Sequence, residues 1–146
     1  MDFRDAINAV IGDLTPQPWQ YTAADGATLT VIPAGLREAP GYGEVYVRVT
    51  ADKTRAAEVG VTTTYMASVL HAIDTSTGYE YINGLWDEIV ITPTEGGGLY
   101  IEVSEVHYEP RREVRTAIVL PPEQRLPLAS AMRRACDVAK SWEDPV

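Results

Sequence analysis

The chain has 146 residues, a length typical of one domain, and its 45% of hydrophobic residues excludes a mainly disordered protein. No apolar run approaches the roughly 20 residues that a membrane-spanning helix needs. Acidic residues outnumber basic ones by 21 to 12, and the net charge of −9 disfavours direct binding to nucleic acid.

A helix and three strands are predicted in the N-terminal part of the chain. Apolar residues spaced three and four apart indicate an amphipathic helix, which Pro16 and Pro18 end. The Asp25-Gly26 pair between two alternating runs is typical of a β-hairpin, and valines at every second position indicate a further strand. The expected elements are a helix over residues 2–14 and strands over residues 19–23, 27–32 and 44–50.

The segment over residues 61–74 is open to two interpretations. Apolar side chains from Tyr65 to Ile73 fall on one face of a helix, which favours a central helix. The β-branched residues Thr62 to Thr64 and a turn before Tyr79 also fit a strand that leads into a hairpin. Beyond this segment we expect strands over residues 79–83, 88–92, 99–108 and 113–120, and a long helix over residues 127–142.

These elements define a single α+β domain over residues 1–146, with a mainly antiparallel sheet of about six or seven strands. One helix is expected at the N-terminus, one at the centre and a long one at the C-terminus, and no internal repeat is evident. The element order, small size and acidity resemble those of the chaperones of type III secretion. That resemblance implies a protein that binds a partner protein, as a possible homodimer, and performs no chemistry.

The negative charge is concentrated between residues 56 and 110. This stretch has nine acidic residues and no lysine or arginine, and aromatic residues are interleaved with the acids. A surface of one sign attracts a partner of the opposite sign, and tyrosine and tryptophan suit interfaces. We therefore predict a protein that covers a basic surface of a partner protein. It would act as a nucleic-acid-mimicking inhibitor such as a phage-encoded anti-defence protein, as a secretion chaperone or as an immunity protein. The expected contacts are the aromatic anchors Tyr79, Tyr81 and Trp86 and the carboxylates of Glu80, Asp87, Glu88, Glu102, Glu105 and Glu109.

Residues 55–70 support an alternative interpretation. Ala57, Gly60 and Thr62 fit a small residue, a turn glycine and a helix cap, and the segment resembles the helix-turn-helix of LacI-type repressors. That resemblance implies a DNA-binding regulator. However, no basic residue occurs between residues 56 and 70 to contact phosphate, so direct nucleic-acid binding is not expected. A structural subunit of a virion-type assembly is a further alternative.

No arrangement of residues in the sequence indicates catalysis. Cys136 lies on the apolar face of the expected C-terminal helix, and no serine has the setting of a nucleophile elbow. Glu105, His107 and Glu109 alternate as metal ligands could, but such a row is more simply the solvent face of a strand. We therefore expect a non-enzymatic protein without a cofactor or metal. The single cysteine and the lack of an apolar leader favour the reducing cytoplasm.

Overall fold

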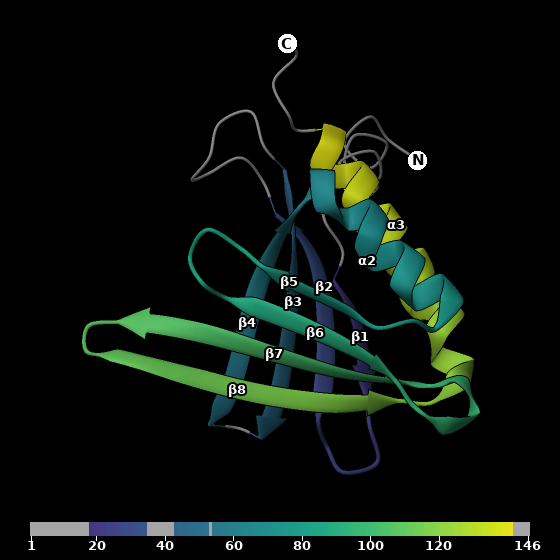
Figure 1. Cartoon of the computed structure of the whole chain (residues 1–146), viewed down its shortest axis with the longest axis horizontal. Coiled ribbons are helices and arrows are strands. Elements are labelled where there is room, and N and C mark those ends of the chain that lie inside the picture. Colours follow the sequence, from purple (N-terminus) through teal and green to yellow (C-terminus); the bar gives the residue numbers. More distant parts are fainter. Residues whose placement is uncertain (1–17, 35–42, 53, 142–146) are drawn as a thin grey trace, which may run out of the picture.

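The computed structural model describes residues 18–34, 43–52 and 54–141, and the helix predicted over residues 2–14 lies outside these ranges. The described chain contains two four-stranded antiparallel sheets, each followed by a helix (Figure 1). The strand order is β1-β2-β3-β4 in the first sheet and β5-β6-β7-β8 in the second. The elements are β1 (Trp19–Thr22), β2 (Thr28–Ala34), β3 (Glu44–Asp52), β4 (Arg55–Thr62), α2 (Thr63–Thr75), β5 (Tyr79–Ile82), β6 (Glu88–Pro93), η1 (Glu95–Gly97), β7 (Leu99–Tyr108), β8 (Arg111–Leu120), η2 (Pro122–Gln124) and α3 (Arg125–Ser141).

The predicted α+β class and antiparallel pairing are confirmed, but the prediction of one sheet is wrong, because the described strands form two. The ambiguous segment contains helix α2, which begins at Thr63, and strand β5 follows it. The long C-terminal helix is also confirmed. Helix α3 begins at Arg125, and Pro127 fits within its first turn, where backbone N–H groups have no partner inside the helix.

Strand β4 is missing from the sequence prediction, which assigned these residues to the first helix of a helix-turn-helix. Ala57, Val59 and Val61 are fully buried and alternate with outward-facing residues, which is the two-residue period of a strand. Gly60 faces outward beneath the ring of Tyr46, and a Cβ atom there would lie 3.0 Å from Tyr46 Cε1. The helix-turn-helix interpretation is therefore wrong.

The two sheets pack against each other through their inner faces, and Figure 1 shows the strands of one sheet crossing those of the other. Strands β3 and β4 contact β7 and β8. Fully buried branched side chains such as Val47, Val59, Ile101 and Val103 fill the space between the sheets. Helices α2 and α3 pack against each other, and α3 contacts β2 and β3. The helices therefore lie at one end of the molecule, and the tip of the β7–β8 hairpin lies at the other.

The second half of the described chain repeats the topology of the first, although the sequence shows no repeat. Each half has four antiparallel strands in chain order and then a helix. The strand register matches as well. Trp19 pairs with Val31 in the first half, and the residues 60 positions later, Tyr79 and Ile91, pair with each other in the second half. Equivalent positions in the two halves can therefore be compared directly.

Two further observations concern the single cysteine and membrane-spanning helices. Cys136 is buried in the apolar face of α3. None of the helices in the described ranges is long and apolar enough to cross a membrane.

Candidate functional site

The β5–β6 turn, residues 83–87, has the same backbone as the β1–β2 turn, residues 23–27. In the first turn Ala23 N donates to Ala27 O at 2.8 Å, and in the second Asn83 N donates to Asp87 O at 2.9 Å. The fourth residue has a left-handed φ in both turns, 90° at Gly26 and 68° at Trp86. A left-handed backbone costs a side chain roughly 1–2 kcal/mol, and glycine avoids that cost. Trp86 therefore occupies a position where the other half of the molecule has glycine.

The side chains of Asn83 and Tyr108 hold the β5–β6 turn in place. Asn83 Oδ1 accepts hydrogen bonds from Leu85 N at 2.8 Å and Asp87 N at 3.1 Å, and Asn83 Nδ2 donates to Gly60 O at 3.2 Å. The hydroxyl of Tyr108 donates to Leu85 O at 2.7 Å. The turn is thus tied to β4 and to β7 as well as to its own hairpin.

The same turn presents large apolar side chains to solvent. Leu85 is 60% exposed and Trp86 is 68% exposed, and Tyr108 on the adjoining strand is 53% exposed. We call these three residues the turn cluster. The β1–β2 turn has no large apolar residue, since its sequence is Ala-Ala-Asp-Gly-Ala. Exposed apolar groups that gather at one site mark binding surfaces more often than scattered ones do.

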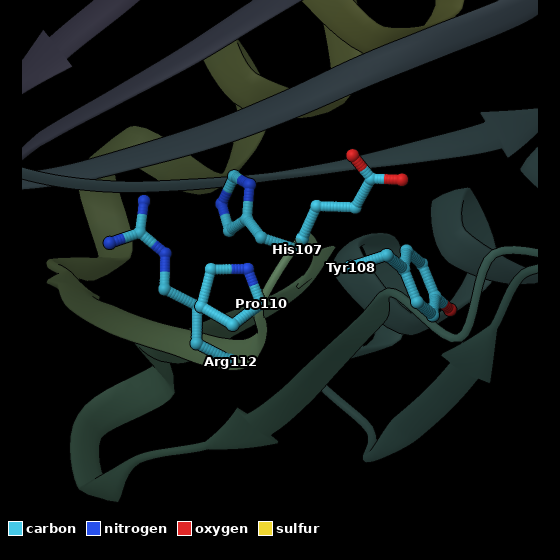
Figure 2. A pocket seen from close by; sticks show the side chains of 5 residues that line it. His107, Tyr108, Pro110 and Arg112 are labelled. Carbon is cyan, nitrogen blue, oxygen red and sulfur yellow. The ribbon is translucent and has the colours of Figure 1, made fainter.

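The β7–β8 hairpin supplies a cavity next to the turn cluster. His107, Tyr108, Glu109, Pro110 and Arg112 line a hollow of about 650 Å³ at the hairpin tip (Figure 2). His107 pairs with Arg112 across the two strands, and Figure 2 shows their side chains next to each other while Tyr108 points away from them. Tyr108 thus belongs both to the hollow and to the turn cluster.

The fold also gathers arginines around this hairpin. Arg111 and Arg112 are exposed and form no ion pair with another described residue, whereas Arg115 contacts Glu102 and Glu113. Arg55 at the start of β4 donates to the backbone oxygen of Arg115 on β8. These arginines flank the base-free stretch in sequence and meet only in the folded chain, so the sequence did not reveal the cluster.

The residues predicted as partner contacts are separated in the structure. Asp87 is only 8% exposed, and its carboxylate accepts a hydrogen bond from Val106 N at 2.8 Å. Glu105 accepts a hydrogen bond from Glu58 N at 3.0 Å and so covers the edge of β4. Both carboxylates therefore satisfy backbone groups of the fold.

The remaining predicted residues fall in four places. Tyr79 and Tyr81 pack against the core, and the ring of Tyr81 lies 5.1 Å from that of Tyr65 between centroids. Glu109 lines the hairpin hollow, and Trp86 belongs to the turn cluster. Glu80, Glu88 and Glu102 come together on the outer face of the second sheet, on three successive strands.

The three carboxylates on that outer face interact with one another and with their neighbours. Burial, and next a hydrogen bond with Glu80, raise the pKa of Glu88 above its ordinary value. The hydroxyl of Tyr100 donates to Glu102 at 3.0 Å, and this hydrogen bond raises the pKa of Tyr100. Acidic charge therefore gathers on the outer face of the second sheet, where Arg115 of the β7–β8 hairpin contacts Glu102.

Replacing Glu88 with glutamine is expected to stabilise the protein at pH 7 by about 0.5 kcal/mol, the scale of a cross-strand pair. A carboxyl group with a raised pKa in the folded state stabilises it only below its ordinary pKa, 4.5, and that contribution is lost as the pH rises through the folded-state value. The measurement is the free energy of unfolding in urea between pH 4 and pH 7. The free energy of unfolding of the unmodified protein should decrease as the pH rises above 4.5, and the variant should not show this decrease.

Glu113→Gln is the control for this prediction. Arg115 lowers the pKa of Glu113, so the carboxylate stabilises the fold above pH 4.5 and the control should destabilise the protein at pH 7. Equal effects of the two variants would contradict our account of the outer face.

Comparison with solved structures identifies the fold. The plant transcriptional regulator PBF-2 is similar with a TM-score of 0.66 at 15% identity, over 88% of this chain and 84% of that one. WHY1 from Arabidopsis thaliana gives 0.66 at 12% identity, over 88% and 93% of the two chains. MRP1/MRP2 from Trypanosoma bruciei give 0.58 at 13% identity, over 92% and 93%. No protein-family model matches the sequence, and no curated protein sequence is similar to it. The chain thus has the Whirly/MRP-like fold.

This fold corrects the functional predictions. The Whirly and MRP proteins are non-enzymatic, as we predicted for this chain, but they bind single-stranded DNA or RNA directly, and the Whirly proteins form oligomers. The predicted protein-binding module that imitates nucleic acid is therefore wrong, and so is the exclusion of nucleic acid as a partner. The net charge misled because a sum over the whole chain does not report where exposed arginines such as Arg111 and Arg112 lie on the surface.

Proposed function

We propose that this protein binds single-stranded nucleic acid at the tip of the β7–β8 hairpin. The observation that carries the proposal is the tip of the β7–β8 hairpin, on a fold shared with single-strand-binding proteins. There Arg111 pairs with Tyr108, whose ring is exposed, and the exposed Arg112 lies next to His107 (Figure 2). Guanidinium groups bind phosphate, and aromatic rings bind unpaired bases. The hollow beside His107 gives a base or a phosphate room between these groups.

Single strands fit this site better than a duplex does. Duplex readers commonly place a basic helix in the major groove. The helix that a helix-turn-helix interpretation would place there, α2, has no lysine or arginine. Bases in a duplex are stacked on one another, so their faces are closed to a protein ring. The acidic outer face of the second sheet repels phosphate, so we expect the strand to stay close to the hairpin.

The test is fluorescence anisotropy with labelled single strands of DNA and of RNA. The strands have about 16 nucleotides, the upper end of the range that one binding module covers. Duplexes of the same sequences are measured for comparison. We expect binding of single strands at low salt, weaker binding of duplexes and a steep loss of affinity with added salt. An absence of single-strand binding at low salt would overturn the proposal.

Replacing both Arg111 and Arg112 with alanine is expected to raise the Kd for single strands about tenfold at low salt. Losing two phosphate contacts should also reduce the slope of log Kd against log salt by about 1.4. The control is Arg134→Ala, because Arg134 is an exposed arginine on α3, at the opposite end of the molecule. Equal losses in the two variants would mean that only overall charge matters and that the hairpin is not the site.

A further inference from the structure

The tryptophan at the β5–β6 turn is not explained by the fold. The β1–β2 turn has the same hydrogen bonds with glycine at the equivalent position, so the turn itself does not require an indole. Trp86 has a left-handed φ of 68° and remains 68% exposed, so its ring gains little from burial. Strained backbone that the surroundings hold in place is found preferentially at functional sites.

The turn is rigid, which suits it to binding. Asn83 holds the backbone on both sides of Trp86, and its side-chain amide is anchored on Gly60 O of β4. Tyr108 holds Leu85 from β7. A turn backbone that is fixed before the ligand arrives loses little conformational entropy on binding.

The neighbourhood indicates what the ring binds. Tyr108, which holds the turn, pairs across the hairpin with Arg111, and Arg112 follows on β8. An exposed ring near guanidinium groups that form no ion pair with another described residue matches a nucleotide, which has a flat base and an anionic phosphate. A partner with only an apolar surface would give these arginines no anionic group to bind.

We propose that Trp86 is a preformed stacking anchor for one unpaired base of the bound strand, with the adjoining phosphates on Arg111 and Arg112. This inference rests on the proposed function and adds to it the residue that recognises the unpaired base. It also explains why only one of the two equivalent turns has a large ring.

The test compares Trp86→Gly with the unmodified protein. Glycine fits the left-handed backbone, so the melting temperature should be unchanged or higher. The Kd for labelled oligothymidylate should rise about tenfold, the range for one lost base stack. The slope of log Kd against log salt should not change, because a stacked base releases no counterions. Leu126→Ala is the control, because Leu126 is an exposed apolar residue on α3, and it should bind as the unmodified protein does.

A second readout detects stacking directly. Oligothymidylate should quench tryptophan emission in the unmodified protein, and Trp86→Phe should remove most of that quenching while retaining part of the affinity.

Two results would overturn the anchor. One is that the Trp86→Gly variant and the unmodified protein bind single strands with the same affinity. The proposed function would then stand, but Trp86 would not be part of the site. The other is that Trp86→Gly retains its affinity and sediments as a smaller species, which would show that the ring contacts a second copy of the chain. Failure of the unmodified protein to bind any single strand would instead overturn the proposed function.

Discussion

Replacing Arg125 with alanine is expected to lower the free energy of unfolding by about 3 kcal/mol, because three charge-assisted hydrogen bonds are lost together. The guanidinium of Arg125 donates to Ile73 O at 3.0 Å, Asp74 O at 2.7 Å and Gly97 O at 3.2 Å. The first two carbonyls belong to the last turn of α2, where backbone oxygens lack partners inside the helix. Arg125 on α3 therefore links the helix of the first half to the η1 segment before β7.

The charge of Arg125 adds to its hydrogen bonds. The C-terminal end of a helix is the negative end of its dipole, and α2 has no basic residue in its own last turn. Arg125 supplies that charge from another helix, and Arg133, which contacts Asp74, adds a second one.

The measurement for Arg125→Ala is urea unfolding followed by circular dichroism, with two companion variants. Arg125→Lys keeps the charge but not the fork of donors, so it should recover less than half of the loss. Arg134→Ala removes an exposed arginine from the same helix and should change the stability by less than about 0.5 kcal/mol. If Arg125→Ala also lowers the free energy of unfolding by less than about 0.5 kcal/mol, water replaces the three hydrogen bonds.

The elements that could be predicted from sequence are those with long apolar periods. Helix α3 buries the residues that its spacing indicated, from Leu128 to Ala139, and α2 buries Met66, Val69 and Ile73. Strand β4 was misread because a short run of small residues, Ala57 to Gly60, also fits a helix that ends in glycine. Tertiary packing between the sheets decided in favour of the strand.

The second hairpin had a local signal that our sequence analysis did not use. Asn83-Gly84 favours a turn, as Asp25-Gly26 does, so the sequence also indicated a hairpin near residue 84. The two pairs occupy different positions of the two equivalent turns, so they did not indicate the 60-residue offset of the register. The division of the strands into two sheets could not be predicted in this way. Buried and exposed residues alternate along a strand in the same manner whether the strands form one sheet or two.

The candidate site was only partly accessible to sequence reasoning. Trp86 was singled out for its surroundings of acids, yet Asp87 beside it is buried and serves the fold. Arg111 and Arg112 lie just beyond the base-free stretch, and only the antiparallel register of β7 and β8 places Arg111 opposite Tyr108. Charge counted along the chain does not report which side chains share a surface.

Replacing Gly43 with alanine is expected to destabilise the protein by about 3 kcal/mol or more, because a new methyl group would overlap backbone that cannot move aside. A Cβ atom at Gly43 would collide with the carbonyl group of Ala139 on α3 and lie 3.0 Å from its Cβ atom. Gly43 O also accepts a hydrogen bond from Thr63 N at 3.1 Å, at the start of α2. The glycine thus lets the start of β3, the start of α2 and the end of α3 approach one another.

Gly84→Ala is the matched control for this substitution. No heavy atom lies within 4 Å of a Cβ atom at Gly84, and its φ is outside the left-handed region. Alanine should therefore be neutral there, or stabilise the protein slightly by restricting the unfolded chain. Thermal unfolding of both variants checks the prediction, and a Gly43→Ala protein as stable as the control would mean that α3 can shift away from β3. Because α3 also provides Arg125, such a shift would show that the two helices can move without the sheets, whereas the expected loss would mean that helices and sheets form one cooperative unit.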